Sequence, residues 1–329
     1  MRVPSQFILP LLVLSINSSL AAQTHQVALT FDDLPFVADH DSLSTPSLVA
    51  KSAEAANRKL LKALTHHKVP VTGFVIQKRV GNLGLPSGEG ILRKWTQGGL
   101  DLGNHTDSHF DFNDLTAEQY EDEIVRGEAA IVPVMKAVGR KPEFFRFPFN
   151  HTGDSKQKHD ALAAFLAQRG YRLAPCTIEN SDWMFNSSYV QMLARHDRAS
   201  ATRLRAEYLA FTSAQIDYFA GLNTQVLGHE PPEIMLLHDN QLNADVIEKL
   251  LALFEKKQYR WVSLAQAESD PVYQSPDSTI TRYGPMWGYR WARERGVKVD
   301  GSREPEPPKW ITDYGKDKPS PPRRPRSEF

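Results

Sequence analysis

Two adjacent carboxylates, Asp32 and Asp33, follow a short apolar segment at residues 27–31. We expect that segment to form a strand, and ligands of α/β folds bind at the carboxyl ends of strands. Successive side chains of an extended segment point to opposite sides, so one carboxylate could bind a metal ion while the other accepts a proton. Because aspartate also favours turns and helix caps, the pair taken alone is more typical of a turn.

Two histidines, His105 and His109, follow the third expected strand, at residues 100–103. Side chains four residues apart lie on one face of a helical turn and can bind one metal ion. This spacing also arises by chance on helix surfaces, and Asp107, between the two, points away from that face. With Asp33 the histidines would form a site of two imidazoles and one carboxylate with open positions, the ligand set of a hydrolytic zinc-type site.

Three further strand ends carry polar residues of catalytic type. Arg146 lies in an aromatic run at residues 144–149, where it needs a carboxylate partner if it is buried and otherwise extends to the surface. Asp182 follows the fifth expected strand, where the alternative is a solvated loop. His238 ends the sixth, where a single histidine is more often structural. Polar residues of these types at five strand ends indicate an active site, because a barrel builds its site from several strand ends.

The hydrophobic periodicity predicts alternating strands and helices. We expect strands at residues 27–31, 69–76, 100–103, 144–147, 171–176, 234–237 and 260–262. We expect helices at residues 47–66, 91–95, 115–138, 156–168, 189–227 and 244–256. Pro133 should kink the long helix that contains it or end it early. About seven such units over about 240 residues favour a distorted, closed or nearly closed (β/α) barrel with a parallel sheet over an open α/β sheet.

Charge and cysteine content exclude several classes of site. The 329 residues include 39 lysines and arginines and 39 aspartates and glutamates, so the net charge is zero. This balance provides no argument for a nucleic-acid partner or an anionic membrane surface. Because Cys176 is the only cysteine, no intrachain disulfide can form, and a metal site must use histidines and carboxylates.

The two ends of the chain differ from its middle. Residues 1–22 combine a positive start, an apolar run at 7–16 and small residues at the end, as in a cleaved signal peptide. An uncleaved anchor is the alternative, and either would place the protein outside the cytoplasm, secreted or periplasmic. We find no other long apolar run and expect no stable membrane span. We expect a catalytic domain at 23–270 and an extension at 271–329 rich in proline, arginine and aromatic residues, whose last part, 316–329, should be mobile.

Five segments in this order resemble the motifs of the NodB-type polysaccharide deacetylases, a carbohydrate esterase family. They are Thr30-Phe-Asp-Asp33, His105-Thr-Asp-Ser-His109, Arg146-Phe-Pro-Phe149, Asp182-Trp183 and Leu236-Leu-His238. The resemblance covers residues 26–265 and implies a distorted (β/α) barrel. It also implies that Asp33, His105 and His109 hold a divalent metal ion, with zinc the expected ion.

The resemblance implies roles for the other motif residues as well. Asp32 would be the general base and Arg146 would orient it. His238 would be the general acid, and Asp182 would keep it charged, since a nearby carboxylate raises a histidine pKa. The remaining implied residues surround the acetyl group. The Phe149 backbone N–H would donate to the oxyanion, and Trp183 and Leu236 would form the apolar pocket for the methyl group.

The motifs depart from the family pattern at two positions. Phe149 stands where the family usually has tyrosine, a change that leaves the backbone role intact. Glu179 stands where the fourth motif usually opens with aspartate, so the role of that position is open. His151, just after the third motif, could contact substrate or metal. The helical insertion at residues 189–227 should shape a divergent substrate groove.

These observations predict a metal-dependent hydrolase that removes acetyl groups from a polysaccharide or oligosaccharide. The expected reaction is N-deacetylation of N-acetylglucosamine units in peptidoglycan or a chitin-like chain. The alternatives are an O-acetyl esterase acting on acetylated xylan, a small-amide C–N hydrolase, and an inactive carbohydrate-binding domain. The intact set of motif residues speaks against the inactive domain. The exact sugar, its chain length and the oligomeric state have no signal in the sequence.

Overall fold

A computed structural model describes residues 25–38, 45–275 and 277–314. The predicted signal peptide at 1–22 and the expected mobile end at 316–329 lie outside these residues.

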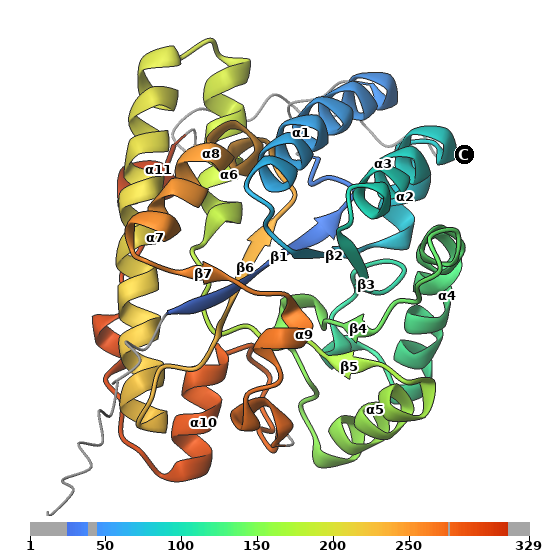
Figure 1. Cartoon of the computed structure of the whole chain (residues 1–329), viewed down its shortest axis with the longest axis vertical. Coiled ribbons are helices and arrows are strands. Elements are labelled where there is room, and N and C mark those ends of the chain that lie inside the picture. Colours follow the sequence, from blue (N-terminus) through green and yellow to red (C-terminus); the bar gives the residue numbers. More distant parts are fainter. Residues whose placement is uncertain (1–24, 39–44, 276, 315–329) are drawn as a thin grey trace, which may run out of the picture.

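The described residues form one curled sheet of parallel strands surrounded by helices (Figure 1). The strands are β1 (Gln26–Leu34), β2 (Val71–Val75), β3 (Asp101–Asn104), β4 (Phe144–Phe145), β5 (Arg172–Leu173), β6 (Glu233–His238) and β7 (Arg260–Trp261). Their order is β5-β4-β3-β2-β1-β6, and β7 pairs with the start of β1. The central strand β1 is buried along its length, as expected for a parallel strand covered on both faces.

The sheet curls far enough for its two edges to meet at one point. Ile178, which follows β5, forms an isolated parallel bridge with Met235 of β6. The Leu236 N–H donates to the Ile178 carbonyl at 2.9 Å, and the Thr177 N–H donates to the Ile234 carbonyl at 3.0 Å. The predicted fold, a distorted (β/α) barrel, is therefore confirmed.

Helices cover the outside of the sheet (Figure 1). The helices are α1 (Pro46–His66), α2 (Gln77–Asn82), α3 (Leu85–Gln97), α4 (Ala117–Lys136), α5 (Lys156–Arg169), α6 (Asp182–Ala194), α7 (Arg198–Leu227), α8 (Gln241–Lys256), α9 (Leu264–Ala267), α10 (Trp287–Arg295) and α11 (Lys309–Thr312). Short 3₁₀ turns lie at η1 (Phe112–Asp114), η2 (Pro148–Asn150), η3 (Pro271–Gln274) and η4 (Gly301–Arg303). The capping box of Thr116 and Gln119 begins α4.

Several element boundaries differ from the predicted ones. Strands β4 and β5 are shorter, because Pro148 and Pro175 follow closely and proline has no N–H for the ladder. The helix predicted at 189–227 is two helices, α6 and α7, separated by a turn in which His196 has a φ of 58°. Pro133 does not end α4 early, since the buried Val134 and Met135 continue its last turn into the core.

The described part of the C-terminal extension is joined to the barrel. Trp287 and Trp291 are buried in the same apolar cluster as the β1 side chains. Arg290 of α10 is 1% exposed and forms an ion pair with Asp277 at 2.5 Å. The same guanidinium donates to the Asn150 carbonyl at 2.6 Å, beside the third motif. The extension is therefore held against the carboxyl end of β4.

We expect Arg290→Ala to lower the free energy of unfolding by about 3–5 kcal/mol, because it leaves the Asp277 carboxylate buried without its cation. Urea unfolding measures the change. Lys156→Ala is the control, since Lys156 pairs with Asp160 in an exposed position where ion pairs contribute little. An Arg290→Ala protein as stable as this control would show that the pair does not anchor the extension.

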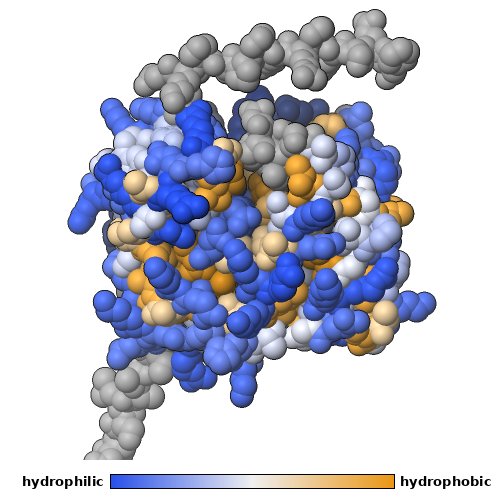
Figure 2. Space-filling view, turned by 90° about the horizontal axis from the view of Figure 1, so that it is seen from above, coloured by the Kyte–Doolittle hydropathy of each residue, from blue (hydrophilic) through white to orange (hydrophobic). Residues whose placement is uncertain are grey.

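Among the described helices, none combines the length and the apolar composition that crossing a membrane requires. Seen from above, the surface is mostly hydrophilic with smaller hydrophobic areas between the polar side chains (Figure 2). Scattered exposed apolar side chains of this kind are normal for a folded domain.

Candidate active site

The end of β1 is irregular, and this irregularity places both of its carboxylates on one side. Asp33 has a left-handed φ of 68°, and the register with β2 shifts between Phe31 and Leu34. The expected alternation of side chains to opposite sides is therefore wrong here. The Nε2 atom of His105 lies 3.8 Å from Asp32 Oδ2 and 3.7 Å from Asp33 Oδ1. Aspartate tolerates a left-handed conformation better than most residues.

The two histidines of the second motif lie in a loop, so the predicted helical face is wrong. Thr106 and His109 both have a positive φ, 70° and 60°. Side chains hold this loop: Asn104 Oδ1 accepts from the Thr106 N–H at 2.8 Å, and Thr106 Oγ1 accepts from the His109 N–H at 3.0 Å. The turn brings the imidazole centroids of His105 and His109 to 5.1 Å. Their convergence comes from this turn and not from helical spacing.

Asp33, His105 and His109 form a set of atoms that fits a divalent cation. One ligand atom from each lies within 4.8 Å of the others. His105 Nδ1 lies 2.8 Å from the Arg146 carbonyl, which can only accept, so Nδ1 carries the proton and Nε2 presents its lone pair. Asp33 Oδ1 is buried and has no hydrogen-bond partner among the described residues. This orphaned oxygen lies 3.4 Å from His109 Nε2, as a shared ion would require.

The electrostatics of these three residues favour the protonation states that metal ligands need. Burial would raise the pKa of Asp33, but opposing charges, chiefly that of Arg79, outweigh burial and keep the pKa below its usual range. Burial lowers the pKa of His109 to about 4 and lowers that of His105 as well. At neutral pH the set is therefore one carboxylate and two neutral imidazoles, ready to bind a cation without releasing protons.

We expect His109→Ala to weaken zinc binding by about 100-fold or more. Removing a residue that only hydrogen-bonds to a metal ligand already lowers metal affinity by about 10–100-fold, and His109 would be a ligand itself. Isothermal titration with zinc measures the affinity. His66→Ala removes an exposed histidine at the end of α1 and should bind zinc as the unaltered protein does. Equal affinities for the two variants would remove His109 from the candidate metal site.

Arg146 is fully buried and pairs with Asp32. Its Nη1 donates to Asp32 Oδ1 at 2.8 Å and to Thr30 Oγ1 at 2.7 Å. Its remaining donors meet the carbonyls of Ala174 and Pro175 at 3.3 and 3.1 Å. The side chain does not extend to the surface, and its many partners fix the orientation of Asp32.

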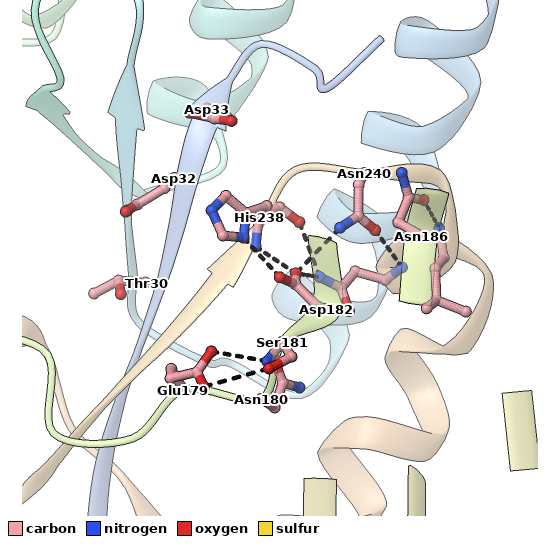
Figure 3. Close-up of polar contacts among 12 residues, drawn as sticks. Thr30, Asp32, Asp33, Glu179, Asn180, Ser181, Asp182, Asn186, His238 and Asn240 are labelled. Carbon is pink, nitrogen blue, oxygen red and sulfur yellow. Dashed lines mark hydrogen bonds and ion pairs between the residues drawn. The ribbon is translucent and has the colours of Figure 1, made fainter. Parts of the chain in front are cut away.

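His238 and Asp182 form the second charged pair of the site (Figure 3). His238 Nδ1 lies 2.6 Å from Asp182 Oδ1, and the His238 backbone N–H donates to Asp182 Oδ2 at 2.7 Å. Asn240 and Asn243 also donate to Oδ2, so the carboxylate is held from several sides. Burial opposes the charged imidazole, but the Asp182 carboxylate outweighs burial and raises the pKa of His238 to about 10. The imidazole is therefore protonated at neutral pH.

One cavity of about 580 Å³ is lined by both carboxylates of β1, both histidines of the second motif and His238, whereas the buried Arg146 and Asp182 do not line it. The three residues predicted around the acetyl group all line it: Leu236 is buried, whereas Phe149 and Trp183 are about half exposed. Glu179 lines it as well. His151 does not line this cavity, and its Nδ1 lies 2.8 Å from Asp111 Oδ1, so the idea that it could contact substrate or metal has no support.

Several residues of the site were not predicted from the sequence. Arg79 of α2, an element that was not predicted, donates to Asp33 Oδ2 at 3.2 Å. Tyr289 and Glu304, together with Gly284, Pro285 and Met286, line the cavity from the C-terminal extension. Gly284 lies so close to Phe149 that a Cβ atom there would meet the Phe149 carbonyl at 1.8 Å. The aromatic composition of the extension was the one available signal, and it carried no information on where the extension packs.

A known protein family, two curated proteins and several solved structures resemble parts of this chain. A family model described as polysaccharide deacetylase matches residues 20–171. A peptidoglycan-N-acetylglucosamine deacetylase of Bacillus cereus is 23% identical over 158 residues, 48% of this chain and 46% of that protein. A chitooligosaccharide deacetylase of a Bradyrhizobium species is 30% identical over 123 residues, 37% of this chain and 46% of that protein. The chain thus spans about half the length of these curated relatives.

Among solved structures, a CE4 family pseudoenzyme from Bacillus anthracis superposes with a TM-score of 0.49 at 13% identity, covering 74% of this chain and 66% of that one. The family match at residues 20–171 includes both carboxylates of β1, both histidines of the second motif and Arg146. The chain is thus similar to the polysaccharide deacetylase family over these residues, and the remaining two motifs follow in the expected order, at the start of α6 and at the end of β6.

Proposed function

We propose that this protein is a metal-dependent hydrolase that removes the acetyl group from N-acetylglucosamine units of peptidoglycan or a chitin-like chain. One observation carries the proposal: a buried carboxylate, a metal-type triad and a protonated imidazole line the same cavity. A base and an acid beside one cation are what amide hydrolysis requires.

Asp33, His105 and His109 would hold the cation, for which we propose zinc on the basis of their ligand chemistry. When bound, a divalent cation lowers the pKa of water at the site and stabilises negative charge on the acetyl carbonyl oxygen. Arg79 donates to Asp33 Oδ2 and leaves Oδ1 free to face the histidines.

Asp32 is the proposed base. It accepts the proton of the attacking water as the oxygen adds to the acetyl carbonyl carbon. Its Oδ1 is occupied by Arg146 at 2.8 Å, so Oδ2, which faces His105, is the oxygen free to take that proton. The guanidinium fixes the carboxylate in this orientation.

His238 is the proposed acid. Its Nδ1 is committed to Asp182 at 2.6 Å, which leaves the Nε2–H to protonate the leaving nitrogen as the C–N bond breaks. In Figure 3 the imidazole points from the end of β6 towards β1, where Asp32 and Asp33 lie. After this step acetic acid and a free amine remain, and the proton taken by the base replaces the one that the acid donated.

The groups around the acetyl moiety complete the site. The Phe149 backbone has a left-handed φ of 59°, and we propose that its N–H donates to the developing oxyanion. Trp183 and Leu236 supply the apolar surface that would receive the methyl group.

The substrate and the compartment are argued from other observations. The two curated relatives are named for N-acetylglucosamine polymers, peptidoglycan in one case and chitooligosaccharide in the other. Residues 1–22 have the pattern of a secretion signal, which suits a substrate outside the cytoplasm. We therefore propose a secreted or periplasmic enzyme.

Acetate release from N-acetylglucosamine oligomers and from acetylated xylan tests the proposal. Each substrate is offered to the purified protein before chelation, after chelation and after zinc is restored. We expect release from the oligomers that stops with the chelator and returns with zinc. Release from xylan alone would favour the O-acetyl esterase. Release from neither polymer, with zinc bound, would contradict polysaccharide deacetylation and leave the small-amide hydrolase and the inactive domain.

A further inference from the structure

The cavity contains two carboxylates that the mechanism does not use, Glu179 and Glu304. The other acidic groups of the site have cationic neighbours: Arg146 pairs with Asp32 and Arg79 with Asp33. Within the described residues, neither Glu179 nor Glu304 forms an ion pair. No lysine or arginine is among the described residues that line the cavity.

Glu179 precedes α6, on the side of the cavity where Asp182 lies (Figure 3). Its partners are neutral, since it accepts from the Ser181 N–H at 2.8 Å and from the Ser181 hydroxyl at 3.4 Å. Burial, with the charges of Glu304 and Asp182, raises the pKa of Glu179 to about 7. The surroundings therefore disfavour its negative charge.

Glu304 comes from the C-terminal extension, just after η4. Its Oε2 accepts from the Tyr289 hydroxyl at 2.7 Å, and Tyr289 contacts the Tyr218 hydroxyl at 2.7 Å. These neutral partners hold the Glu304 side chain in the wall of the cavity without neutralising it. Burial raises its pKa as well.

Two carboxylates that influence each other across one cavity, with no ion-pair partner among the described residues, are costly to keep charged, and the protonated His238 offsets only part of this cost for Glu179. A ligand that carries a positive charge into the cavity offsets this cost, whereas a neutral ligand of the same size does not. The cavity volume of about 580 Å³ leaves space for groups beyond the acetamide itself. An ammonium group complements the charge of the two carboxylates. A deacetylase encounters this group on its own products, because each turnover produces a free amine that takes up a proton.

Building on the proposed function, we propose that the enzyme selects substrates with a primary ammonium group close to the acetamide, and that Glu179 and Glu304 recognise this group. A glucosamine unit next to an N-acetylglucosamine unit has this chemistry, and so does a monoacetylated diamine. On a polymer, the preference would direct the enzyme to units beside those already deacetylated. Glu179 and Glu304 are thus specificity-determining residues outside the metal site.

Paired substrates that differ in charge test the inference. N,N′-diacetylchitobiose is compared with the glucosamine–N-acetylglucosamine dimers in both orders. N-butylacetamide is compared with N-acetyl-1,4-diaminobutane, to separate the sugar source from the diamine source. We expect kcat/KM for the ammonium-bearing member to exceed that of its neutral partner by about tenfold or more in at least one pair, the size typical of a close charge pair.

Isosteric variants assign the preference to the two residues. In Glu179→Gln and Glu304→Gln the amide oxygen can still accept from Ser181 or Tyr289, so only the charge is lost. Each variant should lower the ratio of kcat/KM for the ammonium-bearing substrate to kcat/KM for its neutral partner. The double variant should bring this ratio close to one. Glu306→Gln removes an exposed charge of the same extension, outside the cavity lining, and should keep the ratio.

Each outcome decides between the two claims. Equal kcat/KM for charged and neutral substrates, with acetate released, would overturn the inference and leave the proposed function intact. If no substrate is hydrolysed, calorimetry compares the binding affinity of the glucosamine dimer, which carries two ammonium groups, with that of neutral cellobiose. This comparison needs no turnover. Tighter binding of the diamine sugar that is lost in the double variant would support the inference while the proposed function fails. Equal binding would overturn both.

Discussion

Asp32→Asn should retain its zinc and lose nearly all acetate release. Asparagine keeps the size of the side chain and can still accept from Arg146, which lies 2.8 Å from Asp32 Oδ1. It cannot take a proton from the attacking water, and a positioned base contributes about 10²–10⁴-fold to the rate. We would measure kcat on N-acetylglucosamine oligomers together with the zinc content of the same sample.

Asp107→Asn is the matched control for this variant. Asp107 lies between the two histidines in sequence but contacts Arg126 at 3.3 Å and does not line the cavity. It should retain full turnover and full zinc content. Full turnover in Asp32→Asn would remove Asp32 from the role of base, and loss of zinc there would make Asp32 part of the metal site.

His238→Ala should slow deacetylation by about 10²–10⁴-fold, the contribution of a positioned proton donor. Without the imidazole the leaving nitrogen must take its proton from solvent. The defect should be smaller with an ester of an acidic alcohol, whose leaving oxygen needs no proton. His229→Ala, which removes a partly exposed histidine paired with Asp270, is the control. Equal losses on amide and activated ester would show that His238 does not act as the acid.

Asp182→Asn should change the pH profile in a defined direction. The Asp182 carboxylate is the largest influence that raises the pKa of His238 to about 10, against burial that lowers it. Without that charge the pKa falls, and the imidazole loses its proton at lower pH. The alkaline limb of kcat/KM should therefore move to lower pH, whereas the limb would stay in place if Asp182 had only a structural role.

The same cavity joins parts of the chain with different origins. The strand ends supply the motif residues that line the cavity, whereas the C-terminal extension supplies Tyr289, Glu304 and the segment at Gly284. Arg290 and Asp277 attach this extension to the backbone beside Phe149. Any change that loosens the extension should therefore alter the substrate range as well as the stability.

The order of strands and helices could be predicted because it depends on short-range patterns. Apolar segments of strand length, helix caps such as Thr116 and Gln119, and glycine after α5 act through neighbouring residues. The predicted helix and strand boundaries were wrong where contacts between distant parts of the chain determine them. In α4, the buried Val134 and Met135 continue the helix beyond Pro133, and burial of those two residues depends on the whole core.

The sequence by itself determined which residue types stand at the strand ends, because motif order and spacing are properties of the chain. Only the tertiary structure decided how they meet. Arg146 needed a carboxylate partner, and the fold supplies Asp32, 114 residues away. His105 and His109 converge through a left-handed loop, which is held by local hydrogen bonds and also by Glu123 of α4, whose oxygens accept from the Asp107 and Ser108 N–H groups. Arg79 and Glu304 reach the site from elements that carry no motif, since proximity between distant segments is a property of packing and not of local sequence.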